Sequence, residues 1–147
     1  RSRRTLLTDA LVRSGQRQAG RVVSHETDPA DPETLVRALA ELLPTGAVQR
    51  EDAAAWVAFG AAASTRPWLA DPYWEALVIM RTWVEGVLAG TRQAGLMRTD
   101  LSPAEGARLV TALVNGLALD LLNAPPTEPD EVIGQLRSGL GLVLRGL

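Results

Sequence analysis

The 147 residues suffice for one domain with a hydrophobic core, and 46% hydrophobic with 22% charged residues is a globular composition that argues against disorder. The chain has no cysteine, which excludes disulfide bonds, thiolate metal sites and cysteine nucleophiles. All 15 basic residues are arginine, but 17 acidic residues outnumber them, and the net charge of −2 excludes a broad electrostatic surface for nucleic acid.

Helical spacing of apolar residues describes the first part of the chain. Ser2 is placed to cap a first helix, in which apolar residues recur every three or four positions to about Val23. A polar stretch then ends in an Asp-Pro pair. Asp31 as the N-cap and Pro32 as the first helical residue predict a short second helix. Pro44 ends it, because proline lacks the backbone N–H that a continuing helix needs.

Proline also separates the next two predicted helices. A third helix is predicted over about 48–64 and ends before Pro67, because a residue that precedes proline avoids helical geometry. The Asp-Pro pair at positions 71 and 72 repeats the arrangement of N-cap and first-turn proline, and so predicts the start of the longest helix. That helix extends to about Ala94, where Gly95 is suited to the left-handed conformation that closes many helices.

The last two helices begin at recognisable signals. The Ser-Pro-Ala-Glu sequence at 102–105 is a capping box with proline in the first helical position, and it predicts a helix that runs to residue 122 or 123. The proline pair at 125 and 126 ends this helix. The last helix follows residue 127 or 128 and extends to the end of the chain, with acidic residues early and arginine late, as the helix dipole favours.

No run of alternating residues rich in Val, Ile, Thr or Tyr predicts a β-sheet. The links between helices are short, so consecutive helices are expected to pack antiparallel. We therefore predict an all-α fold, an antiparallel bundle of about six helices that forms a single domain over residues 1–147. No stretch is apolar over the roughly 20 residues of a membrane span, and the basic N-terminus lacks the apolar region of a signal peptide. We expect a cytoplasmic protein without membrane contact.

The last two predicted helices carry more apolar surface than one core explains. Residues 109–122 are apolar in almost every direction, and a helix of that kind is buried on both sides. Small residues such as Gly134 run between two apolar stripes of the last helix and permit close helix approach. A four-helix interface between two copies explains both features, and ordinary core of a monomer is the alternative. The expected interface residues are Leu113, Leu117, Leu121, Ile133, Leu136, Arg137, Leu140, Gly141 and Leu144.

Four phrases of the sequence, in their order and spacing, resemble the TetR family of transcriptional regulators. Ser-Arg-Arg-Thr-Leu-Leu-Thr-Asp-Ala at 2–10 resembles the phrase with which the DNA-binding headpiece of that family ends. Ala-Trp-Val-Ala-Phe at 55–59 is similar to a phrase of its betaine-regulator-like branch. The turn at 95–103 and the Asn-Gly-Leu-Ala-Leu stretch at 115–119 resemble its usual turn and its dimer-side helix. The family often has aspartate where Asn115 stands.

The resemblance implies the C-terminal ligand-binding and dimerisation domain of a regulator, usually a repressor, whose N-terminal helix-turn-helix domain is missing from this chain. Operator DNA would be bound only through that absent domain, and two chains would form a homodimer. A small effector would bind between the third to fifth helices, shift the first helix and change the separation of two headpieces. The alternative is a plain helical dimerisation or adaptor domain that binds no small molecule.

The four tryptophans, the tyrosine and the phenylalanine all lie between positions 56 and 83. Large flat apolar walls beside an adaptable methionine suit a pocket for a lipophilic or aromatic effector, and simple core packing is the alternative. Arg81 is placed to pair with an acidic ligand or, more favourably, with its i+4 neighbour Glu85. The expected ligand-binding residues are Trp56, Phe59, Leu77, Met80, Trp83, Thr111, Asn115 and Leu119.

The sequence gives no support for catalysis or metal binding. Acidic residues mostly occupy helix starts, where capping explains them, and His and Cys do not cluster. No catalytic-triad motif and no glycine-rich phosphate loop is present. We therefore expect no enzymatic activity, no catalytic residue, no bound metal and no cofactor.

Overall fold

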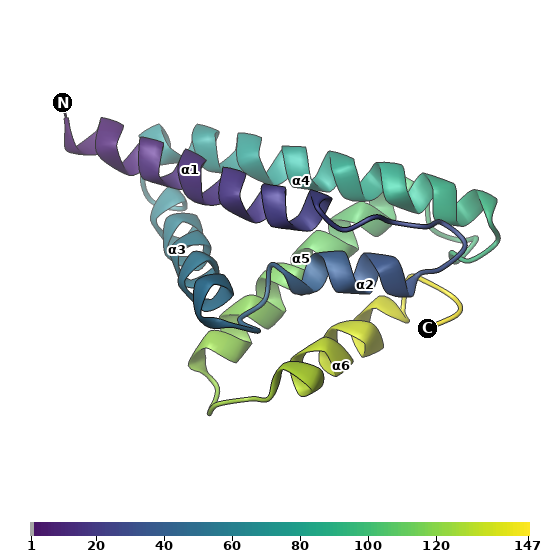
Figure 1. The fold of residues 1–147 in the computed structure, drawn as a ribbon. Coiled ribbons are helices and arrows are strands. Elements are labelled where there is room, and N and C mark those ends of the chain that lie inside the picture. Colours follow the sequence, from purple (N-terminus) through teal and green to yellow (C-terminus); the bar gives the residue numbers. More distant parts are fainter. Residues whose placement is uncertain (1) are drawn as a thin grey trace.

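The computed structural model describes residues 2–147, and all of the regular elements named in that range are α-helices (Figure 1). The prediction of an all-α fold with six helices is confirmed. The helices are α1 (Arg3–Val23), α2 (Glu33–Ala40), α3 (Ala47–Ala63), α4 (Pro67–Gln93), α5 (Pro103–Asn123) and α6 (Pro129–Leu140).

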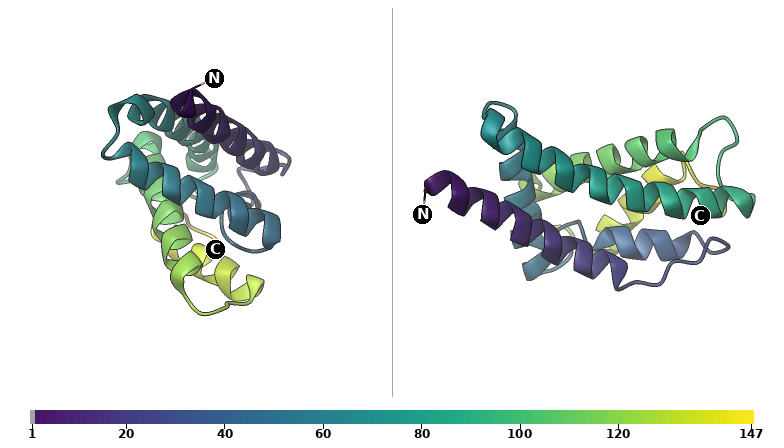
Figure 2. Two further views of the ribbon diagram at one scale, coloured as in Figure 1. Left: turned by 90° about the vertical axis from the view of Figure 1, so that its left-hand side faces the viewer. Right: turned by 90° about the horizontal axis from the view of Figure 1, so that it is seen from above.

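The two long helices α1 and α4 lie side by side along one side of the molecule (Figures 1 and 2). On the other side α2 packs against α6, and α5 lies between these pairs, in contact with α4 and α6. The shorter helix α3 crosses the end of this arrangement and contacts α1, α4 and α5. The cavity described below lies at this end of the bundle, where α3 meets the other helices.

Local capping signals decide several of the helix ends. The Ser102 hydroxyl accepts a hydrogen bond from the backbone N–H of Glu105, whose carboxylate accepts one from the Ser102 N–H, so the predicted capping box is present. Ser2 caps α1 in a similar way, through the N–H of Thr5. Gly95 has a φ of 77°, as predicted for the residue that closes α4.

The start of α4 differs from the prediction. The helix begins at Pro67, and Pro72, expected at its start, lies inside it. Pro67 occupies the first helical position, where no backbone N–H is needed, and the Arg66 carbonyl accepts hydrogen bonds from the N–H groups of Leu69 and Ala70. Pro72 then costs the helix one hydrogen bond near its beginning. Burial of Leu69 in a small core with α1 and α3 favours the longer helix.

The last helix is shorter than predicted. It ends at Leu140, and the chain that follows runs beside the turn after α4. There the N–H of Arg98 donates to the Val143 carbonyl at 3.0 Å, and the N–H of Arg145 donates to the Leu96 carbonyl at 2.8 Å. These hydrogen bonds satisfy backbone groups near the end of the chain, although that segment is not helical. The local sequence pattern did not indicate this arrangement.

The main core joins α2, α4, α5 and α6, and it corrects part of the predicted dimer interface. Leu121, Leu136, Leu140 and Leu144 are buried in this core within a single chain, so they present little or no surface to a partner. The physical reason is that α2 covers the apolar stripe of α6, a role that the sequence pattern had assigned to a second copy.

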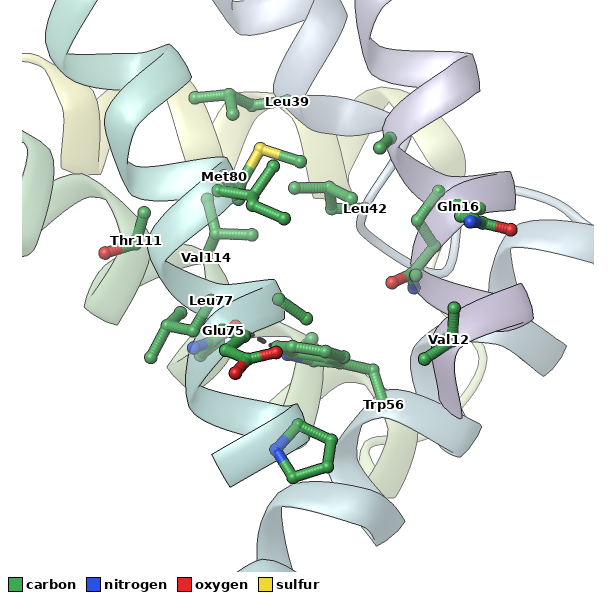
Figure 3. A pocket seen from close by; sticks show the side chains of 18 residues that line it. Val12, Gln16, Leu39, Leu42, Trp56, Glu75, Leu77, Met80, Thr111 and Val114 are labelled. Atoms are coloured by element: carbon green, nitrogen blue, oxygen red, sulfur yellow. Dashed lines mark hydrogen bonds between the residues drawn. The ribbon is translucent and has the colours of Figure 1, made fainter. Parts of the chain in front are cut away.

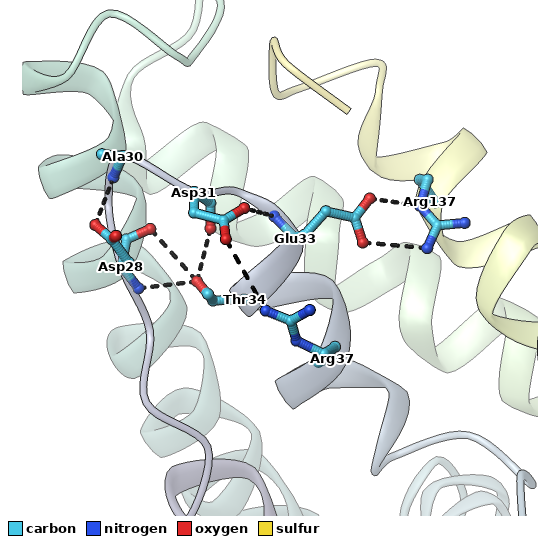
Figure 4. Close-up of polar contacts among 7 residues, drawn as sticks. All are labelled: Asp28, Ala30, Asp31, Glu33, Thr34, Arg37 and Arg137. Atoms are coloured by element: carbon cyan, nitrogen blue, oxygen red, sulfur yellow. Dashed lines mark hydrogen bonds and ion pairs between the residues drawn. The ribbon is translucent and has the colours of Figure 1, made fainter.

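The other predicted interface residues remain partly accessible. Leu113, Leu117 and Ile133 are half-buried at the edge of the core, and Gly141 is exposed. Arg137 forms an ion pair with Glu33, in which Nη2 lies 3.1 Å from a carboxylate oxygen, and so links α6 to the start of α2 (Figure 4). The hydrogen bond from Arg137, partly opposed by burial, lowers the pKa of Glu33.

A compact polar loop positions α2 for this contact. The Thr34 hydroxyl donates to the Asp31 carbonyl at 2.7 Å and accepts from the Asp28 N–H at 2.8 Å (Figure 4). Asp31, predicted as the N-cap, accepts from the Glu33 N–H at 3.2 Å, although the helix itself begins one residue later than expected. The loop thus holds α2 at the angle at which it covers α6.

Candidate ligand-binding cavity

A cavity of about 310 Å³ lies between α1, α2, α3, α4 and α5 (Figure 3). Most of its wall is apolar, as is typical of small-molecule sites. The side chains that line it are those of Val12, Gln16, Gln18, Ala19, Leu39, Leu42, Trp56, Pro72, Glu75, Ala76, Leu77, Ile79, Met80, Thr111, Val114, Asn115 and Ala118, together with the backbone of Gly15.

The mouth of the cavity lies between α1 and α4. Val12 and Gln16 on α1 are exposed, as are Glu75 and Ile79 on α4, whereas the floor is made of buried residues from α2 and α5. Gly15 leaves space between these helices, because a Cβ atom added there would meet no heavy atom within 4 Å. A molecule that enters from solvent would therefore pass between α1 and α4.

Five of the eight predicted ligand-binding residues line this cavity, and three do not. The five are Trp56, Leu77, Met80, Thr111 and Asn115. Phe59 packs into the small core beside α1, Trp83 packs against the main core and borders a shallow surface groove, and Leu119 points to solvent. The pattern had identified the apolar helices correctly, but the rotation of each helix decides which of their residues face the cavity.

Trp56 forms the end wall of the cavity and is held from two sides. Its indole Nε1 donates to Asn115 Oδ1 at 3.2 Å. Its ring stacks on Tyr73 with ring centres 4.4 Å apart and an angle of 26° between the planes. Burial raises the pKa of Tyr73. Gly60 permits this arrangement, because a Cβ atom at that position would lie 2.8 Å from the Tyr73 hydroxyl.

The polar residues around Thr111 do not all face the cavity. The Thr111 hydroxyl donates to the Ala107 carbonyl at 2.9 Å and accepts from Arg81 Nε at 3.3 Å. The Arg81 guanidinium lies over the exposed ring of Trp74, 5.4 Å from its centre. The expected pair between Arg81 and Glu85 is therefore replaced by a contact with α5 and a cation–π contact two turns earlier on α4.

Sequence reasoning missed the wall that α1 contributes. Gln18 and Ala19 lie on the buried face of α1 and line the cavity next to Gly15. The available signal was a glutamine in line with the buried positions Leu11 and Val22, at spacings of seven and four residues. A polar side chain on an otherwise apolar helix face is a candidate for contact with a ligand or with another buried polar group.

An ion-pair cluster fixes the same helix against α3. Asp52 is only 3% exposed, and its carboxylate accepts hydrogen bonds from Arg17 at 3.0 Å and from Arg21 at 2.8 Å. Burial acts to raise the pKa of Asp52, but the hydrogen bonds and charges of both arginines outweigh it and hold the pKa below its ordinary value. The half of α1 that faces the cavity is thus anchored by charge rather than by apolar packing alone.

Two other kinds of site were searched for. Within residues 2–147 no group of three or more His, Asp or Glu side chains is placed to hold a metal ion. In the same range no helix combines the length and the apolar character needed to cross a membrane.

Solved structures of bacterial regulators share this fold. A transcriptional regulator from Rhodococcus sp. Rha1 is 27% identical, with a TM-score of 0.81 over 99% of this chain and 76% of the other. A TetR-family regulator from Rhodococcus sp. is 21% identical, with a TM-score of 0.83 over 97% and 76% of the two chains. A regulator from Saccharomonospora viridis, solved in complex with choline, is 22% identical, with a TM-score of 0.81 over 99% and 77%.

The sequence itself also identifies the family. Residues 32–145 match the model of the BetI-type transcriptional repressor C-terminal domain, which is more than half of the chain. No curated protein sequence is significantly similar. From the family match and the shared fold, we conclude that the chain belongs to the BetI-type C-terminal domains of TetR-family transcriptional regulators.

Proposed function

We propose that this domain senses a small, mostly apolar effector in the cavity between α1 and α4 and pairs with a second copy through α5 and α6. The sensing part of this proposal is supported by the cavity itself, which measures about 310 Å³ and has Trp56 and Met80 in its wall. It is also supported by the match of the chain to a family of transcriptional regulators. A plain dimerisation domain needs no such space, because protein cores are normally packed without large voids.

The position of α1 suggests how binding would alter regulation. This helix forms one wall of the cavity, is anchored to α3 near its C-terminal end, and extends beyond the bundle at its N-terminal end (Figure 1). A ligand between α1 and α4 would move the N-terminal end of α1 relative to the rest of the domain. An effector of this kind must bind one form of the regulator more tightly than the other, typically by about 1–3 kcal/mol.

The choline found in the Saccharomonospora viridis regulator makes choline one ligand to test here. At 22% identity that likeness shows the fold alone. In this chain the wall around the cavity is mostly aliphatic, and the cavity has a volume of about 310 Å³. Both features favour a ligand with a larger apolar body.

Replacing Gly15 by phenylalanine tests whether the cavity is the binding site. The added ring enters open space at the mouth, so we expect the helix to remain folded and the fluorescent probe N-phenyl-1-naphthylamine to bind at least tenfold more weakly. Gly20→Phe is the matched control, because Gly20 lies on the same helix, also meets no neighbour within 4 Å, and does not line the cavity. Fluorescence titration of both variants measures the difference.

Two results would count against the sensor proposal. One is saturable binding of the probe that Gly15→Phe leaves unchanged, which would place the site elsewhere. The other is no saturable binding by the unmodified chain of this probe, choline or a varied set of apolar compounds. The second result would favour a plain helical dimerisation or adaptor domain.

The proposed dimer uses the apolar surface that the core leaves uncovered on α5 and α6. Leu109 on α5 is 52% exposed, and Leu113, Leu117 and Ile133 are only half-buried. Gly134 on α6 leaves open space beside it. Two copies related by a two-fold axis would bury these groups against each other, in the commonest form of symmetric association.

Light scattering at micromolar concentration is expected to give twice the mass of one chain. Gly134→Arg should convert this dimer to monomer, because a charged side chain would stand in the interface, while its Cβ atom would meet no atom of its own chain within 4 Å. Gly86→Arg on α4 is the control, since Gly86 is equally open but lies on another helix. A monomer before substitution, or equal dimers in both variants, would exclude this interface.

DNA contact belongs to the same proposal. The net charge of −2 gives residues 1–147 no broad attraction for phosphate, so we infer that operator DNA is bound by a separate helix-turn-helix domain. A repressor that acts on DNA in the cytoplasm and needs no cofactor or catalytic residue fits these features.

A further inference from the structure

A buried glutamine in the cavity wall has no partner of its own. Gln18 is 6% exposed, lines the cavity from α1, and forms no hydrogen bond with another residue in the described part of the chain. No atom of its amide is among the side-chain atoms that are fully buried without a partner, so the amide stays open to the space that Gln18 lines. Its carbonyl oxygen and its NH2 group are both available to a molecule in the cavity.

A second amide stands on the wall that α5 contributes. The Oδ1 atom of Asn115 accepts the hydrogen bond of Trp56, which leaves the NH2 group of Asn115 without a partner among residues 2–147. The neighbouring Thr111 hydroxyl offers less, since it already donates to the Ala107 carbonyl and accepts from Arg81. Two amide groups of the cavity lining, one on α1 and one on α5, thus keep hydrogen-bonding groups that no other described residue uses.

The buried part of the wall carries no charge. Among the described residues Glu75 is the one charged side chain of the lining, and it is exposed at the mouth, where water screens it. Arg81, which the sequence suggested as a partner for an acidic ligand, lies over Trp74 and does not line the cavity. A charged group brought into this space would lose its hydration without meeting an opposite charge.

We propose that the cavity selects a neutral ligand, one with an aliphatic body and a carboxamide-like head group that donates to and accepts from the Gln18 amide. This selectivity rests on the proposed sensing function and specifies its ligand. Leu39, Leu42, Met80 and Val114 take the apolar body, and the free NH2 group of Asn115 donates to a second acceptor. Gln18 is then the residue that determines specificity, through a contact that a purely apolar pocket would lack.

Three probes of equal chain length separate the possible head groups: octanamide is neutral, while at pH 7 octanoate is an anion and octylammonium a cation. By isothermal titration calorimetry with the intact chain, we expect octanamide to bind at least tenfold more tightly than either ion. Gln18→Met keeps the length and flexibility of the side chain, and it should remove this preference. Gln93→Met, exposed at the end of α4 and outside the cavity lining, should leave it unchanged.

Gln18→Glu gives a test with the opposite sign. A carboxylate at this position would recognise a cation, so octylammonium should become the tightest of the three probes. Thermal unfolding of each variant checks that the fold is retained, and Gln18→Met carries the test if Gln18→Glu does not fold.

The outcomes separate the ligand class from the sensing function. Octylammonium or octanoate binding more tightly than octanamide, with binding lost in Gly15→Phe, would overturn the neutral-ligand proposal while leaving the sensor in place. Equal octanamide affinity in Gln18→Met and the unmodified chain would overturn the role of Gln18. If none of the three probes bound while N-phenyl-1-naphthylamine bound saturably, this inference would fail and the sensing proposal would stand.

Discussion

Substitution of Leu136 by alanine is expected to lower the free energy of unfolding by about 2–5 kcal/mol, the usual cost of emptying a fully buried leucine site. Leu136 has 0% exposure and lies in the core that α6 shares with α2, α4 and α5. The alanine would leave a void among side chains that are held by four helices and cannot close it fully. Urea unfolding followed by circular dichroism measures the loss.

Ile133→Ala provides the comparison on the same helix. Ile133 is half-buried at the edge of the core, so its truncation should cost clearly less in stability and instead weaken dimerisation. The opposite pattern, in which Leu136→Ala weakens the dimer and leaves the unfolding of the monomer unchanged, would show that Leu136 faces a partner. Unfolding at several protein concentrations separates the two effects.

Asp52→Asn is expected to lower the free energy of unfolding by about 3 kcal/mol, the lower end of the range for breaking a buried ion pair. The lower end of the range applies because the Arg17 side chain is 57% exposed, so water would partly replace its lost contact with the carboxylate. Arg21 has less access to water, and two of its guanidinium nitrogens are already buried without a hydrogen-bond partner. Loss of the carboxylate would leave this cation in a poorly hydrated site.

Asp100→Asn is the matched control for Asp52→Asn. Asp100 also pairs with an arginine, Arg98, but both side chains are largely exposed, so the exchange should leave the unfolding midpoint nearly unchanged. Equal effects of the two substitutions would show that the cluster on α3 is no stronger than a surface pair.

The same cluster should make stability depend on pH in a defined direction. The pKa of Asp52 is lower in the folded chain than its ordinary value of 3.8, so the folded state favours the ionised carboxylate. Its contribution is therefore complete above the pKa of the unfolded chain, and is lost as the pH falls through the lower pKa of the folded chain. The difference in stability between the unmodified chain and Asp52→Asn should accordingly shrink as the pH falls below about 4.

Local signals in the sequence were sufficient for the fold class and for most helix boundaries. The capping box at Ser102 and the left-handed Gly95 involve hydrogen bonds within five residues, so their effect does not depend on the rest of the chain. Pro72 shows the limit of such signals, because burial of Leu69 and a second proline at residue 67 extend the helix past it.

Only the tertiary structure decided what each apolar face packs against. The spacing of Leu136 and Leu140 shows that one face of α6 is covered, but a stripe of leucines fits a neighbouring helix and a second copy equally well, and here it is α2 that covers it. The cavity is harder to predict from the sequence, because its position depends on where the side chains of five helices leave space unfilled. For that reason periodicity found Trp56 and Met80, while the spacing of Gln18 marked it only as buried, and its place in the cavity wall followed from the position of α1.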